Sequence, residues 1–367
     1  MTTVSMYPVS PKDIQNKLNQ IWESLETTNV TRACLFNLIF FTEKNHRTPY
    51  IQRLAQKVIE KFPSRVIFVF FDKNTSADFL KTEVSILSSS QGEFDVACDY
   101  IQIEAGGAHL ERIPFVVLPH ILPDLPVYLH WAEDPSTVNP LSEQFSQFAG
   151  RLIFDSESTN NLPRFASSAL EHFEKSHCDI SDLNWARIES WRDMLSMAFY
   201  PQDKLHQIQN AKQINIFYNA QETTFFSHTK IQAVYLQAWL SCQLGWKFKT
   251  LQKDKSTFCF TYQGKNGPIE ISLQAVQYDK LPPGLILSID ILTIDNEQFK
   301  FSRNIDRMHE IAYKHSTPKQ CDIPSYYLFS KAESGHSLVK EIGHRGTSDH
   351  FLKVLKLVKE MDTLDLC

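Results

Sequence analysis

The first half of the chain alternates uninterrupted apolar runs with segments whose apolar residues recur at helical spacing. The runs at 32–41 and 65–72 predict strands buried on both faces, and residues 48–62 between them predict a helix. The same alternation continues, with strands predicted at 96–105, 126–131 and 151–156 and helices at 108–122, 140–149 and 161–176. Strands that alternate with helices favour a doubly wound, mostly parallel α/β sheet.

The second half has a different pattern. Residues 228–246 predict a helix that is apolar on two sides, and Gly245 is placed to end it. Four short segments follow at 246–251, 257–262, 269–276 and 285–292, the last three with period-two alternation, and 297–303 is a further candidate strand before two helices near 334–342 and 348–361. These segments predict a largely antiparallel sheet. We therefore expect an N-terminal α/β domain over 1–178 and a C-terminal α+β domain over 179–367.

Between these regions, residues 181–199 predict one amphipathic helix, capped by Ser181 or Asp182. At 100° per residue, Trp185 and Trp191 share a face with Arg192. A buried, unpaired guanidinium is costly, so Arg192 either pairs with an internal carboxylate or contacts a partner. Asp124 and Asp155 are candidates for that carboxylate. The second interpretation makes the helix a recognition surface that contains Trp185, Arg187, Trp191 and Arg192.

A second candidate surface follows a proline-rich turn. Pro123 and Pro126 bracket Asp124 and fix the backbone at the entry to a strand that ends in Trp131. The carboxyl ends of parallel strands border the usual binding crevice of such sheets. Trp131 is therefore either exposed beside that crevice or packed into a corner with the prolines. Exposure would place Asp124 and Trp131 on a functional surface, because tryptophan is enriched at interaction hot spots.

Composition narrows the classes of partner. The chain has 43% hydrophobic and 22% charged residues, which is typical of a globular protein, and its net charge is −5. A net negative chain has no general attraction to phosphate backbones, so nucleic acid is not an expected partner. We expect no membrane contact and a cytoplasmic location, because no apolar run reaches the length of a membrane span. The seven cysteines include no CxxC pair, and only the terminal Cys367 is a candidate for redox chemistry.

Motifs for catalysis are missing from the sequence. It has no G-x-G-x-x-G, P-loop, H-E-x-x-H or G-x-S-x-G pattern, so we expect neither a cofactor nor a metal. Gly106 and Gly107 follow a predicted strand and precede a predicted helix. Backbone amides in such a turn can bind an anion, although a tight strand-to-helix turn accounts for the glycines equally.

Several stretches together resemble the OpcA family of glucose-6-phosphate dehydrogenase assembly proteins. They are TRACLFNLIF at 31–40, PSRVI at 63–67, VACDYIQIE at 96–104, LPDLPVYLHW at 122–131, RLIFDS at 151–156, DLNWARIESWRDMLSMAF at 182–199 and AWLSCQLGW at 238–246. The chain departs from the family pattern at His130, where a second tryptophan is usual, and at Asp99, where glutamate is common.

The resemblance implies a non-catalytic protein that binds glucose-6-phosphate dehydrogenase, favours its active oligomer and raises its activity. Such a protein controls entry into the oxidative pentose phosphate pathway and the supply of NADPH. In photosynthetic members the effect is linked to thiol redox state, but no close cysteine pair carries that property over to this chain. The alternatives are an enzyme or sensor of sugar phosphates with an anion site near Gly106 and Gly107, and a scaffold for several enzymes.

Overall fold

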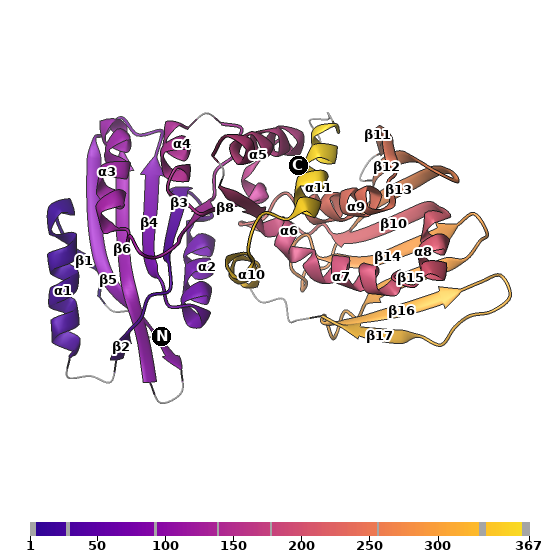
Figure 1. Ribbon diagram of the computed structural model, residues 1–367, viewed down its shortest axis with the longest axis horizontal. Coiled ribbons are helices and arrows are strands. Elements are labelled where there is room, and N and C mark those ends of the chain that lie inside the picture. Colours follow the sequence, from indigo (N-terminus) through magenta and orange to yellow (C-terminus); the bar gives the residue numbers. More distant parts are fainter. Residues whose placement is uncertain are drawn as a thin grey trace. The chain divides into compact units, whose positions relative to one another are not determined.

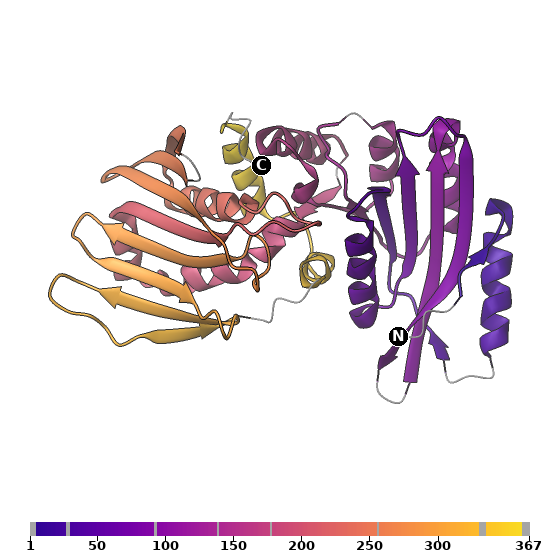
Figure 2. The same ribbon diagram turned by 180° about the vertical axis from the view of Figure 1, so that it is seen from behind.

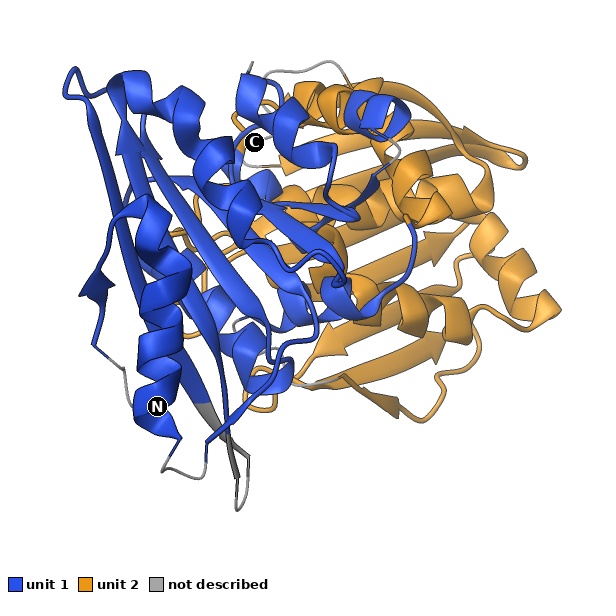
Figure 3. Ribbon diagram, turned by 60° about the vertical axis from the view of Figure 1, so that its left-hand side comes forward, with its two compact units in different colours: residues 1–158, 171–183, 334–346 blue, residues 159–170, 184–333, 347–367 orange. Residues whose placement is uncertain are grey.

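The protein, seen in a computed structural model, forms two compact units (Figure 3). Unit 1 comprises Met1–Ser158, Glu171–Leu183 and Ser334–Gly346, and unit 2 comprises Thr159–Leu170, Asn184–Glu333 and Thr347–Cys367. The structure describes residues 5–26, 30–91, 94–137, 139–176, 178–254, 257–329 and 335–361. The boundary predicted between residues 178 and 179 stays a prediction, since each unit is assembled from several chain segments.

Unit 1 is built on a nine-stranded, mostly parallel sheet (Figures 1 and 2). Its strand order is β1 (Tyr7–Pro8), β5 (Phe79–Gln91), β6 (Phe94–Gly106), β4 (Arg65–Asp72), β3 (Asn37–Glu43), β7 (Val127–Trp131), β8 (Arg151–Phe154) and β9 (Asp179–Asp182), with β2 (Val30–Arg32) beside β6. All pairs from β6 to β9 are parallel, and only β1 and β5 run against their neighbours. The predicted α/β class is confirmed.

Helices cover this sheet because each presents one apolar stripe. Helix α1 (Ile14–Leu25) packs on β5, α2 (Thr48–Lys61) packs on β3, and α10 (His336–Gly343) packs against α2. The remaining helical segments of unit 1 are η1 (Pro11–Asp13), η2 (Gly107–Arg112), α3 (Ile113–Val117), η3 (Leu118–His120), α4 (Pro140–Ser146), η4 (Ser156–Ser158) and the end of α5 (Leu162–Ser176), which begins in unit 2.

A buried arginine ties the α10 segment to unit 1. Arg151 begins β8, is 2% exposed, and donates hydrogen bonds to the carbonyl oxygens of Glu341 and, at 2.7 Å, Gly346. Its guanidinium also lies 3.8 Å from carboxylate oxygens of Glu341 and Asp179. These contacts explain why a segment near the end of the sequence belongs to the first unit.

Unit 2 contains an eight-stranded sheet in which only β10 and β13 pair in parallel. Its order is β11 (Lys247–Asp254), β12 (Thr257–Gly264), β13 (Gly267–Val276), β10 (Ala211–Asn219), β14 (Ile286–Thr293), β15 (Gln298–Arg303), β16 (Glu310–Ser316) and β17 (Ser325–Leu328). The predicted α+β class with a largely antiparallel sheet is confirmed.

The helices of unit 2 lie on one face of its sheet (Figures 1 and 2). Helix α9 (Ile231–Leu244) contacts β10 and β13, and α11 (Asp349–Lys359) packs against α9. Both sides of α9 are therefore buried, as its two apolar stripes predict. Gly245 ends the helix at φ +68°, a conformation that glycine adopts without steric cost. The other helices are α6 (Leu183–Arg187), α7 (Glu189–Ala198) and α8 (Gln202–Gln209).

Two expected helices are broken in the structure. Residues 108–122 form the short segments η2, α3 and η3, which end at the extended residue Ile121. The single helix expected over 181–199 is wrong: Ser181 and Asp182 belong to β9, and Ile188, at φ −92° and ψ 2°, separates α6 from α7. No helix within the described ranges is long and apolar enough to cross a bilayer.

Candidate functional site

Arg192 contacts the tryptophan that shares its helix face. Its guanidinium carbon lies 3.4 Å from the centre of the Trp185 ring, and Nη1 donates a hydrogen bond of 3.2 Å to the Trp185 carbonyl oxygen. Trp185 is 3% exposed and packs on Phe351 of α11, with ring centres 5.4 Å apart. Arg192 thus joins α7 to α6 across the break at Ile188, while its side chain stays half-buried.

The two carboxylates proposed as internal partners of Arg192 differ in environment. Asp124 is exposed, so it is not an internal carboxylate. Asp155 is fully buried, and its Oδ2 lies 2.6 Å from Nη2 of Arg47 within unit 1. The interpretation of Asp124 as an internal counter-ion is therefore wrong, because the proline turn places it in solvent.

Arg187, the other arginine of this segment, is half-buried at the end of α6. Its Nη1 donates a hydrogen bond of 2.6 Å to Oδ1 of Asn184, and its guanidinium carbon lies 5.0 Å from the Phe226 ring centre. Like Arg192, it has its guanidinium beside an aromatic ring.

The proline turn around Asp124 is held by a side chain from β3. Asn37 is fully buried, donates hydrogen bonds to the carbonyl oxygens of Leu122 and Leu125 at 3.0 and 3.3 Å, and accepts one of 2.8 Å from the Leu122 amide. Trp131, at the other end of β7, is 2% exposed and stacks on Phe41 with ring centres 4.2 Å apart. The expectation that Trp131 lies exposed beside a crevice is wrong, since its ring belongs to the core.

A carboxylate already occupies the glycine turn considered as an anion site. Oδ1 of Asp78 accepts a hydrogen bond of 2.8 Å from the Ala108 amide, directly after Gly107. Gly107 has φ +60°, and a Cβ atom there would lie 2.2 Å from Oδ1 of Asp78. At Gly106 a Cβ atom would meet Phe79 and Thr75. Both glycines thus serve close packing of the turn, and the negative charge of Asp78 opposes a phosphate.

Four of the described free thiols are poor nucleophiles. Burial raises the pKa of Cys98 and of Cys178 to about 12, and that of Cys242 and of Cys259 to about 11. Because the thiolate is the reactive form, these cysteines react slowly in the folded protein. Cys367, the candidate for redox chemistry, lies outside the described residues. Within the described ranges, no group of three or more histidine, cysteine, aspartate or glutamate residues is arranged to hold a metal ion.

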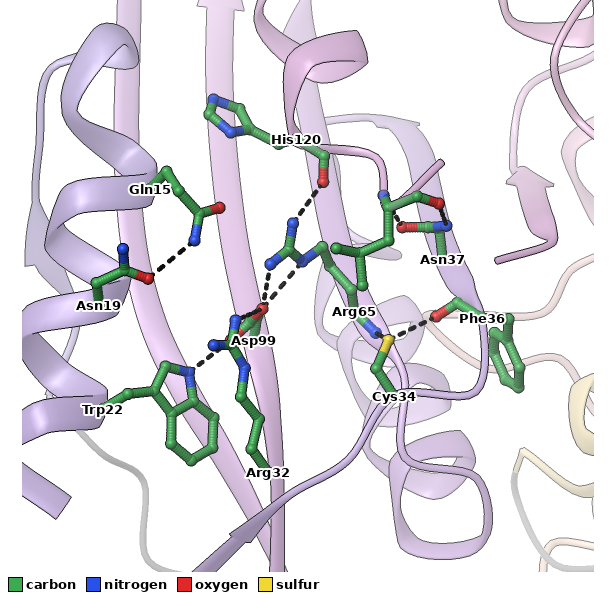
Figure 4. A network of polar contacts seen from close by, with 11 residues as sticks. Gln15, Asn19, Trp22, Arg32, Cys34, Phe36, Asn37, Arg65, Asp99 and His120 are labelled. Carbon is green, nitrogen blue, oxygen red and sulfur yellow. Dashed lines mark hydrogen bonds and ion pairs between the residues drawn. The ribbon is translucent and has the colours of Figure 1, made fainter. Parts of the chain in front are cut away.

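Sequence reasoning missed a polar cluster of unit 1 that centres on Asp99 (Figure 4). Asp99 is 4% exposed, and its Oδ1 accepts a hydrogen bond of 2.7 Å from Nε1 of Trp22. Its Oδ2 accepts hydrogen bonds from Arg65 at 2.5 and 2.9 Å and from Arg32 at 2.8 Å. Arg65 in turn donates to the carbonyl oxygen of His120. The cluster connects α1, β2, β4 and β6.

The surroundings of Asp99 favour the ionised form of its carboxyl group. Burial by itself raises the pKa of Asp99, but the charge of Arg65 and the hydrogen bonds from Trp22, Arg32 and Arg65 outweigh it, so the net pKa is lowered. Asp99 is therefore ionised at neutral pH.

An exposed apolar strip follows the tryptophan–arginine segment. Met197 on α7, Tyr200 in the connection and Leu205 on α8 are 66%, 87% and 39% exposed. These three exposed apolar side chains lie within nine residues of one another along the chain, and a contiguous exposed apolar patch is a feature of interaction surfaces. The sequence alone assigned these residues no role.

The fold defines the class of protein as one with a doubly wound α/β unit and an α+β unit whose sheet is largely antiparallel. The polar clusters described above form hydrogen bonds and ion pairs with other groups of the same chain. Residues 43–171 match the model described as glucose-6-phosphate dehydrogenase subunit N-terminal domain, and residues 178–350 match the corresponding C-terminal domain. The chain belongs to the OpcA family defined by these two domains.

Similar curated proteins carry a related name. A protein of Nostoc punctiforme, provisionally named OxPP cycle protein OpcA, is 24% identical over 212 residues, which are 57% of this chain and 44% of the relative. A protein of Synechocystis sp. with the same provisional name is 28% identical over 151 residues, 41% of this chain and 30% of the relative. The chain thus spans less than half the length of these relatives.

One solved structure has a similar fold. A protein from Desulfitobacterium hafniense, provisionally described as an NADPH-dependent oxidoreductase, matches with a TM-score of 0.51 and 10% sequence identity, over 89% of this chain and 94% of that one. At this identity the likeness concerns the fold alone.

Proposed function

We propose that this protein is a non-catalytic assembly factor that binds glucose-6-phosphate dehydrogenase and favours its active oligomer. The observation that carries the proposal is the consecutive match of both family domains, which are described as parts of a glucose-6-phosphate dehydrogenase subunit. The provisional name of the relatives, OxPP cycle protein, supports the same pathway. By this role the protein controls the oxidative pentose phosphate pathway and the supply of NADPH.

The mechanism is a shift in population. A partner that binds the active oligomer more tightly than the inactive form raises the fraction of active enzyme, and the shift cannot exceed the ratio of the two affinities. The exposed strip of Met197, Tyr200 and Leu205 is the surface we assign to this contact, because it continues the segment at 182–199 that characterises the family pattern. Arg187 and Arg192, both half-buried, border it along the chain.

The test uses glucose-6-phosphate dehydrogenase from the same organism at a concentration that limits its oligomerisation. The initial rate of NADPH formation is measured with and without this protein, while light scattering on the eluting species follows mass. We expect a higher rate together with a heavier, co-eluting species. No change in either signal would refute the proposal, and binding of glucose 6-phosphate by this protein alone would favour a sugar-phosphate sensor.

The contact surface is tested by a double substitution, Met197→Gln with Tyr200→Ser. Both side chains are largely exposed, so the folded state should persist while the affinity for the dehydrogenase falls at least about tenfold, a usual effect of removing interface hot spots. Ile323→Ser is the matched control, because Ile323 is 92% exposed in the same unit but lies far from Met197 and Tyr200 along the chain. An equal loss in both variants would remove the assignment of this surface.

A further inference from the structure

Unit 2 contains a second tryptophan–arginine cluster, formed by Trp191 of α7, Arg303 at the end of β15 and Phe329. The guanidinium carbon of Arg303 lies 5.5 Å from the Trp191 ring centre and 5.3 Å from that of Phe329. The two rings meet edge to face, with centres 5.4 Å apart. The cluster therefore places one cation against two aromatic rings.

Both polar groups of this cluster have unused hydrogen-bonding capacity. Trp191 is 2% exposed, yet its Nε1–H has no acceptor within the described part of the protein. Arg303 donates from Nε to the Ile286 carbonyl oxygen at 3.0 Å and from Nη1 to that of Met308. A guanidinium has five N–H donors, so these two neutral acceptors leave several unused.

The charge of Arg303 is also unbalanced. None of the described carboxylates forms an ion pair with it, and burial lowers the pKa of its guanidinium to about 10 because the charged form loses contact with water. The buried Trp191 N–H without an acceptor destabilises the folded protein, and Arg303, which is half-buried, carries a charge that none of the described carboxylates balances. An anion bound at this position would accept the indole N–H and balance that charge.

In unit 1, an indole N–H and a guanidinium together bind a carboxylate. There Nε1 of Trp22 donates to one oxygen of the Asp99 carboxylate, and Arg65 donates to the other (Figure 4). Trp191 and Arg303 repeat this combination of an indole N–H with a guanidinium, but no described residue supplies the carboxylate. The acceptor is present in the first cluster and missing from the second.

We propose that Trp191 and Arg303 form a binding site for a carboxylate supplied from outside the chain. One guanidinium balances the single negative charge of a carboxylate, and its planar fork matches the two oxygens. A phosphate dianion would keep an unbalanced charge there. Met308, Ile305 and Leu328, which are 40%, 46% and 74% exposed, lie next to the cluster along the chain or the β16–β17 pairing and offer apolar surface to the rest of the ligand.

The carboxylate has two sources of the same chemistry, a small organic acid or an acidic side chain of a partner protein. The proposal stands apart from the function proposed above, because a small acid requires no dehydrogenase. The first experiment titrates sodium acetate into the full, 15N-labelled chain and follows the indole N–H resonances of the tryptophans. Sodium chloride at equal ionic strength, acetamide and inorganic phosphate are the comparison titrants.

We expect acetate to shift the Trp191 indole resonance saturably, while sodium chloride and acetamide do not. Trp191→Phe, which keeps an aromatic ring but removes the N–H, identifies that resonance by its loss. In Arg303→Lys the charge remains and the fork is lost, and acetate binding should weaken at least about tenfold. Trp185→Phe is the matched control and should leave the acetate shift of Trp191 unchanged.

The outcomes distinguish the two possible sources of the carboxylate from each other and from a failure of the proposal. A saturable acetate shift with a further Trp191 shift on adding the dehydrogenase identifies a carboxylate of that partner. The acetate shift without any effect of the dehydrogenase identifies a small acid, whatever the fate of the proposed function. The absence of a saturable acetate shift, or a response to phosphate in place of acetate, would overturn the carboxylate site.

Discussion

At the scale of single residues, the Asp99 carboxylate joins three other elements of unit 1. One buried carboxylate accepts hydrogen bonds from Trp22, Arg32 and Arg65, which come from a helix and two strands. A pair of buried charges is weak evidence for stability, but removing one partner leaves the other charge buried and uncompensated. The consequences of substitution therefore depend on which partner is removed.

Asp99→Asn should destabilise unit 1 by about 3 to 5 kcal/mol, because Arg65 is 3% exposed and would lose its counter-ion. Arg32→Met should cost only about 1 kcal/mol, since the Arg32 side chain is 42% exposed and solvent screens its charge. Urea unfolding of both variants measures the difference. Equal effects would show that Asp99 is not the centre of the cluster.

The same residue predicts a dependence of stability on pH. The folded-state pKa of Asp99 is lowered, so its contribution is present in full above the unfolded pKa of about 3.9 and is lost as pH falls through the folded pKa. The difference in unfolding midpoint between the wild type and Asp99→Asn should stay constant from pH 7 to pH 5 and narrow below about pH 4. A difference that is the same at pH 3 and pH 7 would contradict this assignment.

At the scale of elements, the segment around Ile188 is two helices whose junction is spanned by Arg192. The guanidinium stacks on Trp185 of α6 while its backbone belongs to α7. An arginine on a tryptophan face is thus compatible with a structural role, in which planar stacking and a hydrogen bond to the Trp185 carbonyl oxygen hold the helices at a fixed angle.

Arg192→Met should lower the stability of unit 2 by about 1 to 3 kcal/mol, the sum of a cation–π contact and one hydrogen bond from a charged donor. Arg192→Lys keeps the charge but not the planar stack, so its loss should be intermediate. Urea unfolding followed by tryptophan fluorescence measures both. If Arg192→Met unfolds like the wild type but fails to activate the dehydrogenase, Arg192 is a contact residue and the structural interpretation fails.

Elements with a strong local pattern were predictable, and those defined by distant neighbours were not. The strand at Arg65–Asp72 and the helix ended by Gly245 follow directly from an apolar run and a glycine stop. By contrast β5 (Phe79–Gln91) ends in a serine-rich stretch and is a strand because β1 and β6 pair with it. One partner, β6, directly follows β5 in the chain, but the other, β1, is far away in the sequence, so a local pattern does not reveal that pairing.

The candidate functional residues could likewise be chosen by residue type, but their surroundings could not be predicted. Sequence reasoning selected Trp131 and Trp191 by residue type, but the depth of each ring depends on which elements pack above it, and both are 2% exposed. The link between Trp191 and Arg303, like that between Trp22 and Asp99, joins side chains from elements that are far apart in the chain. Such pairs become visible only once the sheet order is known.

At the scale of the whole molecule, the reactivity of the cysteine thiols can be measured for each unit separately. Cys98 and Cys178 belong to unit 1, and Cys242 and Cys259 belong to unit 2. Burial raises the pKa of the first two thiols to about 12, so their thiolate fraction is about a thousandfold below that of an ordinary thiol with a pKa near 9. In the native protein their alkylation should therefore require local or global opening.

Substitutions that destabilise one unit should accordingly expose only its own thiols. Asp99→Asn should speed the iodoacetamide labelling of the buried Cys98 and Cys178 and leave that of the half-buried Cys242 and Cys259 unchanged, whereas Arg192→Met should leave the labelling of Cys98 and Cys178 unchanged, as measured by mass spectrometry of peptides at pH 8. The exposed Cys321 is the internal control and should react at one rate in every variant. Each unit has its own sheet and core, so the free energy lost in one need not open the other. If either substitution speeds all four labelling rates equally, the chain unfolds as a single cooperative body and the two-unit description does not extend to its stability.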